Sequence, residues 1–222
     1  VETVIQKYYG FEESSSKTGA IKNFKSYLRN KSANVIFNEI TYLVKEKNIN
    51  FIRCQDTNFL TNDRKILMEL ANKIKKSDLN FRIYIETRPE GINDLSVELL
   101  KDLKVDGVGM GIELAGEDFR EESLNRFASQ EKTILAFKLL KKNGIKRTSY
   151  NVIGFPDQNE ESILQTIEFN KLLNPDNITV AYYSPYVGTG QQKKGVDTET
   201  FSEYEFDADA ALRSKSKSKE LS

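Results

Sequence analysis

The side chains best suited to chemistry stand where apolar, strand-like stretches of the sequence end. Asp56 follows one such stretch, Glu86 and Arg88 end the next, Glu113 ends a third, and Tyr186 comes after the last. Carboxylates can act as acids or bases, and arginine binds carboxylates through paired N–H groups. If the strands are parallel, their carboxyl ends meet at one edge, where β/α folds bind ligands. The pattern predicts a polar binding mouth, and strand ends that are polar only because they meet solvent are the alternative.

Glycines dominate one face of the third predicted strand. Side chains alternate along a strand, so Gly107, Gly109, Gly111 and Glu113 share one face of it. Glycine weakens a strand, so the bare backbone should serve a purpose. Two interpretations stay open: close packing against a neighbouring helix, or the floor of a cavity that a bulky ligand approaches, with Glu113 at its lip. The spacing G-x-G-x-G does not match the dinucleotide fingerprint G-x-G-x-x-G.

The second predicted strand carries a polar face made of Arg82, Tyr84, Glu86 and Arg88. Such a face cannot belong to an apolar core, because burying charge without partners is costly. It therefore lines a site or an ion-pair network, or else this is an edge strand with one solvated face. Both interpretations are compatible with the sequence.

The composition excludes several classes of function. Lysine plus arginine and aspartate plus glutamate both number 33, so no overall charge favours nucleic acid or an anionic membrane. Apolar runs are far shorter than the roughly 20 residues that span a bilayer. The absence of histidine excludes Ser-His-Asp and Cys-His catalysis and all histidine metal sites. The one cysteine, Cys54, cannot form an internal disulfide, and we expect it to be a small buried residue in a reducing, cytoplasmic setting.

Strands and helices alternate strictly along the chain. Strands are predicted to start near 51, 81, 107, 149 and 178. Helices are predicted at 33–47, from caps at 61–63 to 76, and at 95–103, 130–143 and 160–173, with Ser32 and Ser129 as N-caps. Such alternation implies an α/β fold with a parallel sheet, either doubly wound or curled into a barrel. The connection at 114–129 is the one irregular stretch.

Several motifs, in order, resemble the core of the radical S-adenosylmethionine (radical SAM) superfamily. The sequence FIRCQDTNF at 51–59 resembles a strand ending in D-D-x-F, with Gln55 in place of the first acid. GIE at 111–113 followed by LNR at 124–126 resembles the G-I-E…L-x-R stretch, IGFP at 153–156 the I-G-x-P turn, and PYVGT at 185–189 the P-x-x-G-T ending. The resemblance is closest to the branch associated with cobalamin-binding domains, beside Elongator-like and methylthiotransferase-like members.

The resemblance implies a parallel (β/α) partial TIM-type barrel with five visible strands, the family's first strand lying upstream of Val1. We accordingly divide the chain into an irregular segment at 1–32 that follows the cluster loop, a barrel body at 33–190, and a loop with a partly disordered tail at 191–222. The family's cluster motif, C-x-x-x-C-x-x-C, does not occur here. Loss of this segment by truncation is the explanation we favour, and degeneration of the motif is the alternative.

The resemblance also implies roles for single residues. Glu113 would accept hydrogen bonds from the ribose or the amino group of S-adenosylmethionine, and Arg126 would pair with its methionine carboxylate. Glu86 and Arg88 would be polar lining or a mutual pair. The remaining implied contacts are the backbone at Ile153 and Gly154 beside the adenine, and Asp56 and Tyr186 against cofactor or substrate.

The function implied is that of an enzyme that binds S-adenosylmethionine and, with a 4Fe-4S cluster held by upstream cysteines, forms a 5′-deoxyadenosyl radical to modify an unknown substrate. The expected partners are the cofactor, that substrate and an electron-donor protein, with neither nucleic acid nor a membrane among them; cobalamin would enter through a separate domain. This chain alone is expected to be inactive. The alternative is a cluster-free barrel that binds a nucleotide-like, sugar or phosphate ligand, with Glu86 and Glu113 as acid and base.

Overall fold

The computed structural model of the chain describes residues 30–124, 126–155 and 158–183. It contains one five-stranded parallel sheet in which the strands follow their order in the chain, β1-β2-β3-β4-β5. The strands are β1 (Phe51–Arg53), β2 (Arg82–Thr87), β3 (Val105–Glu113), β4 (Lys146–Ile153) and β5 (Asn177–Tyr182). The helices are α3 (Ala33–Lys45), α4 (Arg64–Lys75), α5 (Asp94–Asp102), α6 (Glu117–Leu124), α7 (Gln130–Lys142) and α8 (Glu160–Leu173), with short 3-10 turns η1 (Phe59–Thr61) and η2 (Pro89–Gly91).

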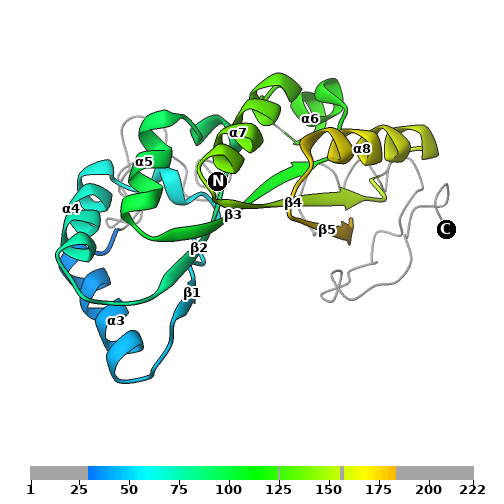
Figure 1. Ribbon diagram of the computed structural model, residues 1–222. Coiled ribbons are helices and arrows are strands. Elements are labelled where there is room, and N and C mark those ends of the chain that lie inside the picture. Colours follow the sequence, from blue (N-terminus) through cyan, green and yellow to red (C-terminus); the bar gives the residue numbers. More distant parts are fainter. Residues whose placement is uncertain (1–29, 125, 156–157, 184–222) are drawn as a thin grey trace, which may run out of the picture.

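The sheet curls into an arc, and the helices lie along its outer, convex side (Figure 1). A strictly sequential strand order with all helices on one side belongs to a partial barrel, whereas a doubly wound sheet carries helices on both sides. The prediction of an α/β partial barrel is therefore confirmed. The inner, concave face of the arc is free of described helices, so its side chains are available to line a site.

The predicted capping residues set where helices begin. The Ser32 side chain accepts a hydrogen bond from Val35 N at the start of α3, and Ser129 accepts from Lys132 N at the start of α7. Each cap satisfies one of the backbone N–H groups that a helix start leaves without a partner. Gly144 follows α7 with φ +72°, a conformation that favours glycine after a helix. Local sequence thus determines these ends before any tertiary packing.

The core lies between the convex face of the sheet and the helices. Side chains at alternate positions of β2 and β3 point outward and are fully or almost fully buried: Ile83, Ile85, Val108, Met110 and Ile112. They pack in one cluster with apolar residues of the covering helices, Leu70, Ile74, Leu100, Phe137 and Leu140. The polar residues of β2 consequently face the other way, and β2 is flanked by β1 and β3. The edge-strand interpretation of β2 is therefore wrong.

Hydrogen bonds between polar side chains also join β4 to α8, which contributes Phe169 and Leu173 to the core. Ser149 Oγ donates to Asn170 Oδ1 at 2.5 Å, and Asn170 Nδ2 donates to Asn151 Oδ1 at 2.8 Å. Arg147, only 4 % exposed, donates to Asp176 just before β5. Buried polar groups are tolerated only with such partners, so these hydrogen bonds restrict how β4 packs against α8 and the start of β5.

The connection at 114–129 contains a helix that the sequence did not suggest. Its residues form α6, of which only Arg120 is buried. A helix this polar shows no apolar stripe, and periodicity alone therefore could not reveal it.

Candidate functional site

An ion pair stands at the carboxyl end of β3, on the concave face. Arg126 Nη2 lies 2.8 Å from Glu113 Oε1, and both side chains are largely buried. Gly111, two residues before Glu113, leaves the space they occupy: a Cβ there would lie 2.5 Å from Glu113 Oε1 and 3.2 Å from Arg126 Nη1. The structure thus brings together two residues predicted to act on one cofactor.

The backbone at Glu113 is strained. Its φ of +62° is in the left-handed region, which costs a residue with a side chain about 1–2 kcal/mol. The sheet register between β3 and β4 shifts at the same point, between Gly111 and Glu113. Strain of this kind persists where surrounding structure imposes it, and it is common at functional sites. Here it turns the Glu113 carboxylate back over Gly111.

Burial raises the pKa of Glu113, and the nearby positive charges of Arg126 and then Arg88 act against that rise. Arg88, which follows β2, is therefore close enough to influence the carboxylate. The carboxylate remains the acceptor in the ion pair, and it is poised for a further donor that would stabilise its charge.

Sequence reasoning did not identify Arg120, which lies in α6, six residues before Arg126. Arg120 in α6 is 3 % exposed, and its Nε and Nη2 have no hydrogen-bond partner among the described residues. Burial lowers its pKa. Its carbonyl oxygen accepts the Arg126 N–H at 2.9 Å, so the turn that presents Arg126 is closed by the Arg120 backbone.

The turn after β4 carries the predicted Ile153 and Gly154. Gly154 has φ +86°, and its N–H donates to the buried Gln158 side chain at 2.5 Å. Phe155, next in the chain, packs its ring between those of Phe119 and Tyr183, at centroid distances of 5.4 and 4.9 Å. These tilted ring contacts and the Gln158 hydrogen bond hold Gly154 and Phe155 in place. Gln158 was missed because its amide acts on backbone, which no motif reveals.

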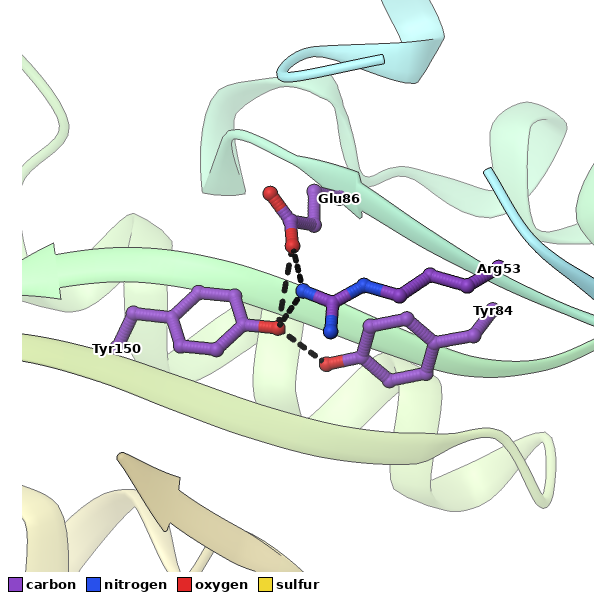
Figure 2. Close-up of polar contacts among 4 residues, drawn as sticks. All are labelled: Arg53, Tyr84, Glu86 and Tyr150. Atoms are coloured by element: carbon purple, nitrogen blue, oxygen red, sulfur yellow. Dashed lines mark hydrogen bonds and ion pairs between the residues drawn. The ribbon is translucent and has the colours of Figure 1, made fainter. Parts of the chain in front are cut away.

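Glu86 belongs to a hydrogen-bonded network on the concave face, level with Gly109 and so two residues before the Glu113–Arg126 level along β3 (Figure 2). Its Oε1 lies 2.5 Å from Arg53 Nη2 and 3.3 Å from the hydroxyl of Tyr150. The Tyr150 hydroxyl also lies 2.8 Å from that of Tyr84. Burial and the hydrogen bond with Tyr84 raise the pKa of Tyr150. The mutual pairing of Glu86 with Arg88 considered above is therefore wrong, because the partner of Glu86 is Arg53.

The two tyrosines also explain the glycine face. A Cβ at Gly107 would lie 2.7 Å from Tyr84 Cδ2, and one at Gly109 would lie 2.5 Å from Tyr150 Cε2. The glycines are needed because rings from the flanking strands β2 and β4 lie over them. Neither earlier interpretation holds: the packing partner is not a helix, and the space above Gly107 and Gly109 is filled.

Asp56 lies after β1, beside a cavity that α3 and α4 also line. Cys54 Sγ donates to Asp56 Oδ2 at 3.1 Å, and both residues line a cavity of about 420 Å³ together with side chains of α3 and α4. Burial raises the pKa of the Cys54 thiol to about 11. The structure therefore does not bring Asp56 together with the Glu113–Arg126 pair. Tyr186 lies outside the described residues.

An iron–sulfur cluster does not fit the residues of this chain. Such clusters are held by cysteine thiolates, and Cys54 is the sole cysteine of the sequence. In addition, the described residues include no group of three His, Cys, Asp or Glu side chains that could hold a metal ion. Nor is any described helix long and apolar enough to cross a membrane.

Comparison with known proteins identifies the family. Residues 11–169, more than half of the chain, match the model of the Radical SAM superfamily, and the chain belongs to that superfamily. Family members bind S-adenosylmethionine and a substrate and use a 4Fe-4S cluster, so the predicted family and its cofactors are confirmed at this level.

The relatives agree with the predicted branch. The chain is 27 % identical over 161 residues to uncharacterized methyltransferase PH0819 of Pyrococcus horikoshii, covering 72 % of this chain and 35 % of the relative. It resembles TsrM from Kitasatospora setae, a radical S-adenosylmethionine methyltransferase solved with cobalamin and a 4Fe-4S cluster, with a TM-score of 0.60, 15 % identity, and coverage of 68 % and 29 %. It also resembles archaeal Elp3 from Methanocaldococcus infernus, with a TM-score of 0.57 and 17 % identity. This match covers 78 % of this chain and 48 % of the Elp3 chain. The chain thus spans about a third of the curated relative's length.

Proposed function

We propose that this chain is the S-adenosylmethionine-binding part of a radical SAM enzyme. The observation that carries the proposal is the Glu113–Arg126 ion pair at the carboxyl end of β3. It lies at the edge of the sheet where β/α folds bind ligands, in a family that uses this cofactor.

Arg126 would hold the methionine carboxylate of the cofactor. Its guanidinium is planar and presents several N–H donors, so it can bind a carboxylate through two of them while one nitrogen stays beside Glu113. Glu113 would keep the guanidinium in place and accept hydrogen bonds from the amino group or the ribose. A donor of that kind would also satisfy the partly desolvated carboxylate.

The turn at Ile153 and Gly154 would lie against the adenine. Gly154 has no side chain to keep a flat ring away from the backbone, and the Gln158 hydrogen bond fixes its orientation. Arg88 would add positive charge near the cofactor's carboxylate. Asp56 and Tyr186 stay proposed as cofactor or substrate contacts, Asp56 from the α3–α4 side of β1.

Bound S-adenosylmethionine would be the source of a 5′-deoxyadenosyl radical, in chemistry that needs a reduced 4Fe-4S cluster. The cluster would be held by cysteines outside this sequence, and an electron-donor protein would reduce it. The chain's own residues would orient the cofactor and exclude water. We further propose a cytoplasmic location and an association with a cobalamin-binding domain, the latter supported by the likeness to TsrM.

The test is formation of 5′-deoxyadenosine by the protein made from its complete coding sequence, with iron and sulfide restored and dithionite as reductant. Arg126→Gln should raise the KM for S-adenosylmethionine about 10- to 100-fold, the equivalent of one charge-assisted hydrogen-bonded contact. Arg82→Gln is the control, because Arg82 starts β2 and pairs with Asp106 at the far end of the strand. The proposal fails if the wild type forms no 5′-deoxyadenosine, or if both variants behave alike. Turnover of another ligand that needs both Glu86 and Glu113 but no cluster would favour the acid–base alternative.

A further inference from the structure

Arg53, the last residue of β1, is held in place from three directions. Its Nη2 donates to Glu86 Oε1 at 2.5 Å and lies 3.5 Å from the Tyr150 hydroxyl. Its guanidinium carbon is 5.6 Å from the centre of the Tyr84 ring, within the range of a cation–π contact. Figure 2 shows the guanidinium between the Glu86 carboxylate and the hydroxyl groups of Tyr150 and Tyr84. The side chain therefore has little freedom left to lose when it binds something.

Much of this guanidinium is nevertheless available. The Arg53 side chain is 53 % exposed, and all of its described hydrogen bonds use Nη2. Nε and Nη1 therefore have no described partner. Arg53 pairs in register with Tyr84, which faces the concave side, so the free N–H groups open onto the interior of the arc. They also lie at the carboxyl end of β1, the edge at which β/α barrels bind ligands.

We infer that Arg53 binds an oxyanion group of the substrate, a carboxylate or a phosphate, inside the barrel. The inference rests on the proposed function, because it assigns the substrate's place beside a bound cofactor. Two N–H groups of a planar guanidinium match two oxygens of such a group, and the prior hold on Nη2 reduces the entropy lost on binding.

Glu86 and the tyrosines orient Arg53 and do not themselves contact the oxyanion. Glu86 uses one oxygen to hold Nη2, and this hydrogen bond is the main reason that the pKa of Arg53 is raised, so the guanidinium stays charged. The tyrosine rings close the space below, over Gly107 and Gly109. A ligand must therefore enter from the strand ends and stop at the level of Arg53.

The proposed oxyanion site and the proposed cofactor site lie at different levels of the sheet. Glu86 pairs with Gly109, and the Glu113–Arg126 pair covers Gly111, two residues further along β3. At about 3.3 Å per residue these levels are about 7 Å apart. The reacting carbon must approach within about 3–3.5 Å of the cofactor's reactive atom. A substrate whose oxyanion lies at Arg53 must therefore extend along the strand direction toward the level of the Glu113–Arg126 pair to meet the cofactor.

The probes are succinate for a carboxylate and methylphosphonate for a phosphate, both observed by saturation-transfer-difference NMR. The protein is the complete one, with and without saturating S-adenosylhomocysteine, which fills the cofactor site and removes Arg126 as a competing anion site. We expect at least one probe to bind the wild type in both conditions, and Arg53→Gln to raise its Kd at least tenfold. Arg53→Lys, which keeps the charge but loses the planar donor pair, should give an intermediate value, and it also decides the question if Arg53→Gln does not fold.

Arg82→Gln is the matched control. Arg82, on β2, resembles Arg53 in three ways. It is exposed, its guanidinium lies 5.7 Å from the centre of an aromatic ring, that of Phe51, and it pairs with a carboxylate, that of Asp106. The Arg82→Gln variant should bind both probes with the same Kd as the wild type. Binding of neither probe, or equal binding by the wild type and Arg53→Gln, overturns the inference. S-adenosylhomocysteine binding is recorded separately, so its loss would count against the proposed function while the probes alone would still decide the role of Arg53.

Discussion

Replacing Gly109 with alanine tests whether the tyrosine pair needs the glycine face. The new Cβ would lie 2.5 Å from Tyr150 Cε2, 2.6 Å from the Tyr84 hydroxyl and 2.7 Å from the Tyr150 hydroxyl. Contacts this short cannot persist, so one or both rings must move. Both rings are held, since the two hydroxyls are 2.8 Å apart and Tyr150 also contacts Glu86 and Arg53.

Three terms determine the magnitude. Overpacking costs about 1–3 kcal/mol. Loss of one hydrogen bond in the tyrosine network costs about 1 kcal/mol more. Alanine is favoured over glycine by about 0.4–1 kcal/mol through the unfolded chain. The net expectation is a free energy of unfolding lower by about 2 kcal/mol, which shifts a urea midpoint by about 1 M for a slope of about 2 kcal/mol/M.

The assay is urea unfolding followed by far-UV circular dichroism, with Gly116→Ala as the control. A Cβ at Gly116 would meet only ordinary contacts, at 3.5 and 3.8 Å, so that variant should stay within about 0.5 kcal/mol of the wild type. Adding Tyr150→Ala removes the nearest ring, and the double variant should recover at least about 1 kcal/mol relative to the sum of the single changes. A Gly109→Ala variant as stable as Gly116→Ala would refute the reasoning.

Three further predictions follow from buried and paired charges. Because the pKa of Glu113 is raised, its contribution to stability is present below its unfolded-state pKa and is lost as pH rises through the folded value. Glu113→Gln should therefore be as stable as the wild type near pH 4 and more stable than it at pH 7. Urea unfolding at both pH values tests this, and a stability difference that does not change with pH would contradict it. The hydrogen bond from Arg147 lowers the pKa of Asp176, so the contribution of Asp176 to stability is present above its unfolded-state pKa and is lost as pH falls through the folded value. Asp176 is 40 % exposed and solvent screens its charge, so Asp176→Asn should cost only about 1 kcal/mol at pH 7 by urea unfolding and less at pH 3; equal losses at both pH values would contradict this. With a pKa of about 11, the half-buried Cys54 is a thiolate in about one molecule in a thousand at pH 8. Peptide mass spectrometry should therefore show slow alkylation by iodoacetamide in the folded protein and fast alkylation in urea, and equal rates would contradict the raised pKa of this thiol.

The sequence predicted the strands well because alternation of apolar and polar residues is a local signal. It placed Ile83 and Ile85 on one face and Tyr84 and Glu86 on the other, as the structure does. It could also place Glu113 at the end of β3 and link Arg126 to it through a motif. The ends of α3 and α7 followed from Ser32 and Ser129, whose capping roles depend only on neighbouring residues.

The features that the sequence did not predict depend on strand register and on backbone conformation. The partner of Glu86 is Arg53 because β1 and β2 pair as they do, with Arg53 opposite Tyr84, and no local pattern contains that register. For the same reason the glycine face looked open, although Tyr150 of β4 lies over Gly109. The positive φ of Glu113 is equally invisible, because glutamate carries no preference for that conformation. A cation at the last position of a strand was the one signal that could have singled out Arg53.

The measurement that tests the account most directly is the affinity for S-adenosylmethionine, by equilibrium dialysis of radiolabelled cofactor against the complete protein. The wild type should bind, Arg126→Gln should raise the Kd at least tenfold, and Arg82→Gln should stay within about twofold of the wild type, since only Arg126 stands beside Glu113 at the strand ends. A wild type that does not bind the cofactor, or an Arg126→Gln variant that binds it as tightly as Arg82→Gln, would contradict the assignment of this edge of the sheet as the cofactor site.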